Sequence, residues 1–225
     1  MLLPCTSACK WRTRQAILSR CMWELKEPKP VKLIVGILAS DERDRAPKSD
    51  SSDLGPDPTR DTSRVGTQRC LAAARESLSS VLGTIDLASD VWTFDQTDYY
   101  LEQIGPQILR QFVSIERLID PGDLAQIKHQ TNAIEQQLAA TLALPFPRPV
   151  NLDPGTIEPS KLVLATTKNY AHRIYIGNRM YAEVTLVFDK GQWRPLPYTY
   201  PDYHRQEYFD FFSQVRTRLV QQLRK

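Results

Sequence analysis

Apolar positions along the chain recur with the periods of strands and helices. Residues 31–39 (VKLIVGILA) are almost continuously apolar and rich in branched side chains, which is typical of a strand buried on both faces. Residues 85–94 and residues 108–119 have the composition of two further strands. The pattern therefore predicts a sheet in which the first strand is central.

Three segments instead carry apolar residues at helical spacing. One helix is predicted to end at Gly83, and a second to begin at Asp120 and Pro121, which suit a cap and a first helical residue. A third is expected to start near Thr199, with Asp202 three residues later as in a capping box. The apolar faces comprise Cys70, Leu71, Ala74, Leu78, Val81 and Leu82; then Leu124, Ile127, Thr131, Ile134, Leu138 and Leu142; then Tyr208, Phe211, Phe212, Val215 and Leu219.

The order of these elements indicates an α+β fold. A strand, a helix, two strands and a helix follow one another between residues 31 and 142. If residues 161–167 form the next strand, the core has the βαββαβ order of a ferredoxin-like split unit, with its helices on one face of the sheet. The C-terminal third then extends this core by an antiparallel meander and a terminal helix.

Face matching predicts the register of the meander. Turns are expected at Gly177-Asn178 and at residues 189–191, with a core face made of alternate residues from Met180 to Phe188. The favoured register pairs Ile176 with Met180, Ile174 with Ala182, Tyr175 with Tyr181 and Arg173 with Glu183. A slip of one residue would place His172 opposite Glu183 instead, so this carboxylate gains a cationic neighbour in either register.

Composition divides the chain into a short extension and one domain. Residues 1–28 are expected to be disordered or to lie upstream of a true start at Met22, and the polar residues 40–66 to form a disordered loop. Residues 29–225 are long and apolar enough to build a single domain with a substantial core. Three cysteines precede Met22, with a spacing that fits no paired metal-binding pattern: Cys5, Cys9 and Cys21.

Charge and hydropathy exclude several classes of protein. The chain has 29 basic and 26 acidic residues and a net charge of +3, a balance too mixed for a dedicated nucleic-acid binder. No apolar run approaches the roughly 20 residues that span a bilayer. We therefore expect a cytoplasmic protein with no nucleic-acid or membrane partner.

Polar residues around the meander form a candidate ligand site. Arg173 and Glu183 could floor a cleft, with His172 at its edge as a group able to transfer protons near neutral pH. Alternatively, these residues form an ordinary cross-strand ion pair on a solvated face of the sheet. Thr167 and Lys168 follow at the end of a predicted strand and could bind a phosphate through a hydroxyl and an ammonium group.

Two further motifs could contribute to this site. Residues 151–155 (NLDPG) are most simply a turn, but Asn151 and Asp153 could also lie at the rim and recognise sugar hydroxyls. Tyr200 and Tyr203, on either side of Asp202, could stack on a ligand ring or fill a half-buried seam.

No named catalytic class is supported by the sequence. The phosphate loop G-x-x-x-x-G-K-[ST], the G-x-G-x-x-G turn, HExxH and the G-x-S-x-G elbow are all missing. The sequence predicts no metal site and identifies neither a cofactor nor a catalytic residue. The candidate ligand-binding residues are therefore Asn151, Asp153, Thr167, Lys168, His172, Arg173, Glu183, Tyr200, Asp202 and Tyr203.

A series of short motifs resembles a known family. KPVKLIVGILASDE, FDQTDYY, IKHQTNAIE, NLDPG, KLVLATTK, HRIY, YAEVTL and TYPDY occur in this order, and in combination they resemble the bacterial family called domain of unknown function 4416, from about Lys29 to the C-terminus. The family has no established activity, so the resemblance implies no catalytic residue. Two hypotheses follow: a small-molecule site for a nucleotide or phosphosugar, or a non-catalytic protein–protein interaction module.

Overall fold

The computed structural model describes residues 26–41, 68–95 and 100–224. The predicted extension before residue 26, including Met22 and the three early cysteines, lies outside the described residues. So do residues 42–67 of the polar tract, although Ser40 is the last residue of a strand. None of the described helices is long and apolar enough to cross a membrane.

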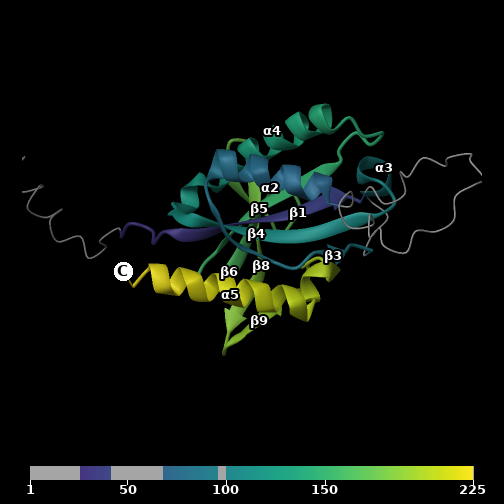
Figure 1. Cartoon of the computed structure of the whole chain (residues 1–225). Helices are drawn as coiled ribbons and strands as arrows, with labels where there is room; N and C mark the ends of the chain where they lie inside the picture. Colours follow the sequence, from purple (N-terminus) through teal and green to yellow (C-terminus); the bar gives the residue numbers. More distant parts are fainter. Residues whose placement is uncertain (1–25, 42–67, 96–99, 225) are drawn as a thin grey trace, which may run out of the picture.

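A large antiparallel sheet forms the centre of the fold, which is α+β as expected (Figure 1). Its main path runs in the order β2-β4-β1-β5-β6-β8-β7, and β3 and β9 pair with β4 and β8. The first predicted strand is indeed central and buried along its whole length. The strands are β1 (Val31–Ser40), β2 (Ile85–Ala88), β3 (Trp92–Thr93), β4 (Ile108–Ile119), β5 (Val150–Ile157), β6 (Lys161–Thr166), β7 (Ile174–Gly177), β8 (Met180–Asp189) and β9 (Gln192–Pro195).

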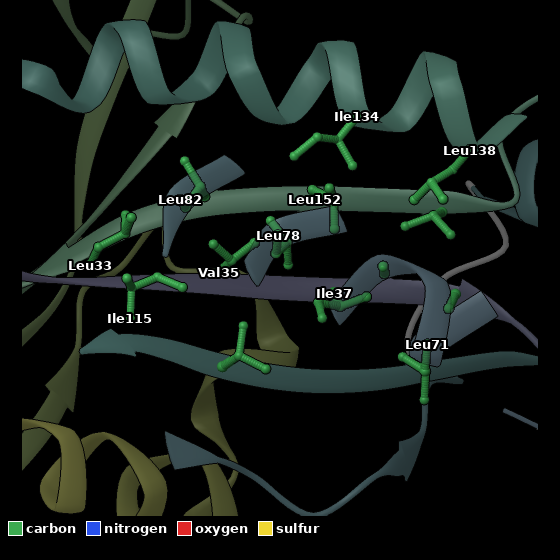
Figure 2. Close-up of a cluster of buried hydrophobic side chains, with 14 of the residues drawn as sticks. Leu33, Val35, Ile37, Leu71, Leu78, Leu82, Ile115, Ile134, Leu138 and Leu152 are labelled. Carbon is green, nitrogen blue, oxygen red and sulfur yellow. The ribbon is translucent and has the colours of Figure 1, made fainter. Parts of the chain in front are cut away.

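Two helices cover one face of the sheet. The predicted helices are present as α2 (Arg69–Leu82), which ends before Gly83 at a φ of 107°, and α4 (Leu124–Leu142). Figure 2 shows their leucines and isoleucines packed against alternate residues of the strands beneath them, such as Leu33, Val35 and Ile37. A short 3-10 turn, η3 (Pro121–Asp123), precedes α4, and the Asp120 carboxylate accepts its capping bond from Gly122 N–H.

The terminal helix α5 (Gln206–Gln222) covers the opposite face (Figure 1). Its buried residues are the five that the helical spacing predicts. They surround Phe112 of β4, whose ring contacts those of Tyr208, Phe211 and Phe212 at centroid distances of 4.8, 6.2 and 5.0 Å. The sheet is therefore the middle of three layers.

The start of α5 differs from the expected cap. A 3-10 turn, η4 (Pro201–His204), comes first, and α5 begins only after Arg205. Thr199 caps no helix: its hydroxyl donates to the backbone oxygen of Thr185 at 2.6 Å and accepts from Leu196 N–H at 2.8 Å. Asp202 is likewise committed elsewhere, because it pairs with Arg110.

The register of the meander is largely as predicted. Ile174 pairs with Ala182 and Tyr175 with Tyr181, but Gly177 rather than Ile176 pairs with Met180 across the turn. A bulge in the β6–β8 ladder interrupts the expected alternation near Thr185, which is fully buried. The predicted polar face of β8 is therefore covered and not solvated.

The motif NLDPG is not a turn but part of β5, beside the central strand. Its proline and glycine suggest a turn, but here they mark a change in pairing within a strand. β5 pairs with β1 along its whole length but with β6 only from Gly155 to Ile157. Pro154, which has no N–H to donate, lies where the β6 ladder stops. The adjacent strands separate at this point.

Side chains of α4 bind the edge of β5 that β6 leaves open. The Lys128 ammonium donates to the backbone oxygen of Leu152 at 2.7 Å. The backbone N–H of the same residue donates to the Glu135 carboxylate, also at 2.7 Å. A buried backbone group without a partner is costly, so these two side chains stabilise the separated strands.

Gly155 is required at the point where β5 and β6 part. A Cβ there would collide with the backbone oxygen of Val163 and lie 2.6 Å from Leu164 Cδ2. Gly155→Ala is therefore expected to lower the free energy of unfolding by about 1–3 kcal/mol, as overpacking does elsewhere. Urea denaturation measures the change. A Gly155→Ala protein as stable as wild type would show that β6 can move away from residue 155 without cost, so that glycine is not required there.

Candidate functional site

A cavity of about 510 Å³ lies where β5 and β6 separate. Residues from the end of β6, from β8, from η4 and from the start of β4 complete its walls. The predicted site residues that line it are Asn151, Asp153, Thr167, Lys168, Arg173, Glu183, Tyr200, Asp202 and Tyr203. His172 is the one predicted residue that does not line it, although it contacts Glu183.

Arg110 of β4 is a deeply buried cation of the cavity, with 4% of its surface exposed. Its Nη2 donates to Asp202 at 2.7 Å, whereas Nε and Nη1 have no hydrogen-bond partner of normal geometry among the described residues. The Tyr208 hydroxyl, which has no such partner either, lies beside the guanidinium. Burial alone would lower the pKa of this guanidinium, but Asp202, the two phenols of Tyr203 and Tyr208, and Asp153 together outweigh burial and raise the pKa. Arg110 is therefore a permanent buried charge with spare donors.

The surroundings of Arg110 explain how a strand in the middle of the sheet holds it. Gly36 on the neighbouring β1 leaves space, because a Cβ there would lie 3.1 Å from Arg110 Nη1. The guanidinium carbon lies 5.1 Å from the ring centroid of Phe94 and 5.8 Å from that of Tyr203. Such cation–π contacts partly replace water around the charge.

Asp153 is the acidic centre of the inner wall. Asn151, two residues earlier on the same face of β5, donates to it at 2.6 Å, and Lys128 Nζ lies 3.4 Å away. Burial raises the pKa of Asp153, but Lys128, Arg110 and the bond from Asn151 together outweigh burial and lower it. The carboxylate is thus ionised at neutral pH and can accept hydrogen bonds from a ligand hydroxyl.

A second carboxylate is held behind this wall. Glu135 of α4 accepts from Arg148 Nε at 2.8 Å in addition to its bond from β5. Burial raises the pKa of Glu135 in spite of the nearby cations Lys128 and Arg148. Burial also raises the pKa of Tyr100, which lines the same end of the cavity, so its phenol stays protonated.

The predicted pairing of Glu183 with a cation is confirmed, and both proposed partners contact it. Its Oε2 accepts from Arg173 Nε at 2.6 Å and lies 3.0 Å from His172 Nε2. The side chains of Arg173 and Glu183 are each 3% exposed, which contradicts the alternative of a solvated surface pair. His172 stacks on Tyr198 at a centroid distance of 4.2 Å.

Arg173 also organises the mouth of the cavity. Its Nη1 donates to the backbone oxygen of Lys168 at 3.1 Å, which fixes the segment after β6. Its guanidinium lies 4.5 Å from the ring centroid of Tyr170, and its Nη2 is 3.5 Å from the hydroxyl of Tyr200. Glu183 therefore fixes, through one arginine, two tyrosines that come from different segments.

The charged side chains of the lining have a positive excess. Five cationic side chains, Arg110, Lys128, Arg148, Lys168 and Arg173, face three carboxylates, Asp153, Glu183 and Asp202. Within the part of the chain that the structure describes, no group of three or more His, Cys, Asp or Glu side chains could hold a metal ion. The arrangement suits binding of an organic anion through guanidinium and ammonium groups.

Sequence reasoning missed several members of the site. Arg110 lies within the apolar segment ILRQFVSI, which is predicted as a strand. A charged residue in a buried strand is rare unless it is paired, so its presence there could have indicated a functional residue. Lys128 and Glu135 lie on the apolar face of α4 at positions i and i+7, which is a similar signal. Arg148 and Tyr170 lie in connecting segments whose course the sequence does not reveal.

Comparison with known proteins identifies the family. No curated protein and no solved structure is significantly similar to the chain. The sequence profile described as "Domain of unknown function (DUF4416)" matches residues 63–219. This span begins after β1 and includes residues from both walls of the cavity. The chain therefore belongs to the DUF4416 family.

Proposed function

We propose that the protein binds a small phosphorylated metabolite, a nucleotide or a phosphosugar, in the cavity between β5 and β6. The observation that carries this proposal is Arg110: a buried guanidinium at the cavity with two nitrogens that lack hydrogen-bond partners among the described residues. Buried polar groups are nearly always hydrogen-bonded, and an unmet donor costs free energy. An anion that accepts from Arg110 removes this cost.

The remaining lining supports a ligand that has hydroxyl groups as well as a charge. Lys168 adds positive charge towards the mouth, which favours a phosphate over a neutral group. Asp153 and Glu183 are acceptors that would repel a second anion but can receive hydroxyl donors. The volume of about 510 Å³ falls within the range of roughly 300–1,000 Å³ that small-molecule sites occupy.

A thermal-shift experiment tests this proposal. Inorganic phosphate, adenosine 5′-monophosphate and ribose 5-phosphate are compared with adenosine and ribose on the full chain. A ligand at a hundred times its dissociation constant should stabilise the fold by about 2.7 kcal/mol. Arg110→Lys keeps a charge beside Asp202 but removes guanidinium donors, so affinity for the phosphates should fall at least about tenfold.

The controls separate binding from folding. Arg117→Lys makes the same change on an exposed residue of the same strand and should bind as wild type does. Lys168→Ala, at an exposed position of the lining, should weaken phosphate binding without loss of the fold. Phosphorylated compounds that bind no better than their neutral counterparts would contradict the proposal.

The alternative of a protein–protein interaction module has one observation in its favour. β7 lies at the edge of the sheet, and Ile174 and Tyr175 on it are 73% and 58% exposed. Exposed apolar side chains on an edge strand can add a partner strand. This role would be preferred if the full chain formed assemblies that Ile174→Lys dispersed, while none of the phosphates shifted the melting temperature.

The proposal also includes the type of core fold and the cellular location. The order β2-β4-β1-β5, with α2 and α4 on one face, supports a ferredoxin-like split unit for the core. In this unit β5 takes the position that the sequence suggested for residues 161–167. Cys70 is buried and forms no disulfide with another described residue, which suits a reducing compartment and supports a cytoplasmic location.

A further inference from the structure

The cavity has two chemically different ends. The inner end holds Arg110, which is 4% exposed and has spare donors. The mouth holds the rings of Tyr170 and Tyr200, which are 50% and 46% exposed. A ligand that fills the cavity therefore meets a buried cation at one end and aromatic surface at the other.

The tyrosines at the mouth are held in place without a ligand. One side of the Tyr170 ring lies against the guanidinium of Arg173, at 4.5 Å from the ring centroid, and the backbone oxygen of Tyr170 accepts from Arg173 N–H at 2.9 Å. Arg173 Nη2 also reaches the hydroxyl of Tyr200. Because Glu183 neutralises and fixes this arginine, the rings lose little conformational freedom when a ligand binds.

We infer that the ligand is a nucleoside phosphate, with its phosphate at Arg110 and its base against Tyr170 and Tyr200. This inference rests on the proposed function and narrows it from phosphorylated metabolites in general. A planar base covers aromatic rings that a free phosphosugar, with its smaller ring face, covers less well. The ribose then lies between the two ends, where Asp153 and Glu183 can accept from its hydroxyls.

Isothermal titration calorimetry on the full chain tests the inference. Adenosine 5′-monophosphate and uridine 5′-monophosphate are expected to bind about tenfold more tightly than ribose 5-phosphate, since stacking a base on an aromatic side chain contributes a factor of this order. Tyr170→Ala should lower the affinity for both nucleotides by about tenfold. The same variant should leave the affinity for ribose 5-phosphate unchanged within about twofold.

Two further variants make the result specific. Tyr200→Ala should repeat the loss at the second ring, while Tyr175→Ala, an exposed tyrosine that does not line the cavity, should change nothing. Ribose 5-phosphate that binds as tightly as the nucleotides, or a Tyr170→Ala variant that weakens all three ligands equally, would overturn the inference but leave the proposed function standing. If none of the three compounds binds, the proposed function itself fails.

Discussion

Replacing Arg110 by methionine is expected to lower the free energy of unfolding by about 3–5 kcal/mol, because it leaves Asp202 as a buried charge without its partner. The Asp202 side chain is 6% exposed and its Oδ2 lies 2.7 Å from Arg110 Nη2. The flexible methionine can occupy much of the space of the arginine stem, so packing changes less than charge. Urea denaturation followed by circular dichroism measures the loss.

The double variant Arg110→Met/Asp202→Asn separates charge from shape. Removing both charges should restore most of the lost stability, since a buried ion pair and a neutral pair of similar volume are often close in energy. Arg69→Met, on an exposed residue at the start of α2, is the control and should change stability by less than about 0.5 kcal/mol, as exposed positions usually do. A double variant as unstable as Arg110→Met would mean that the cation–π contacts of the arginine, and not its ion pair, stabilise the site.

The second large effect is expected at Lys32, near the start of β1, whereas Arg110 lies beside the end of this strand. Lys32 is fully buried, and its ammonium donates to Asp86 at 2.6 Å, to Gln222 at 3.0 Å and to a backbone oxygen of β4 at 3.0 Å. Asp86→Asn removes the charge that compensates Lys32, so we expect a loss of about 3–5 kcal/mol. Asp90→Asn, on an exposed residue shortly after β2, provides the control.

The same pair makes stability depend on pH. Burial would raise the pKa of Asp86, but hydrogen bonds from Lys32 and from Ser114, at 2.5 Å, outweigh burial and hold the pKa below its ordinary value of 3.8. A carboxyl with a lowered pKa stabilises the fold at pH values above about 4, and this contribution is lost as the pH falls through the folded pKa. The stability difference between wild type and Asp86→Asn should therefore shrink below about pH 4. A difference that stays constant down to pH 2 would rule out this origin.

The fold could be predicted where periodicity and burial agree. β1, β4 and the faces of all three long helices follow directly from the spacing of apolar residues, except that Val81 of the predicted α2 face is 46% exposed. β5 could not be found in this way, because Asn151, Asp153, Pro154 and Gly155 are residues that turns favour. In β5 they are tolerated because β6 leaves one side of the strand open and α4 supplies the missing hydrogen bonds.

The candidate site shows the same division. Lys168, after a predicted strand, and Glu183, within one, could be identified because they interrupt apolar patterns. Their convergence could not be predicted, since the cavity depends on where two strands stop pairing. Arg110 could not be identified, because the apolar pattern predicts only the face of the strand on which a residue lies. The role of Arg110 depends on the space that Gly36 leaves on the neighbouring strand.

The short ladder between β5 and β6 has a consequence for how this family varies. Within the sheet, the described residues of these two strands join the part of the chain up to β5 to the part from β6 onward through three residue pairs. Arg110, Lys128 and Asp153 lie on one side of this junction, while Lys168, Arg173 and Glu183 lie on the other. Neither part of the chain contains all the residues of the site. The residues at positions 110 and 183 should therefore vary together among relatives. In a relative that ends after β5, position 110 should no longer be conserved as arginine.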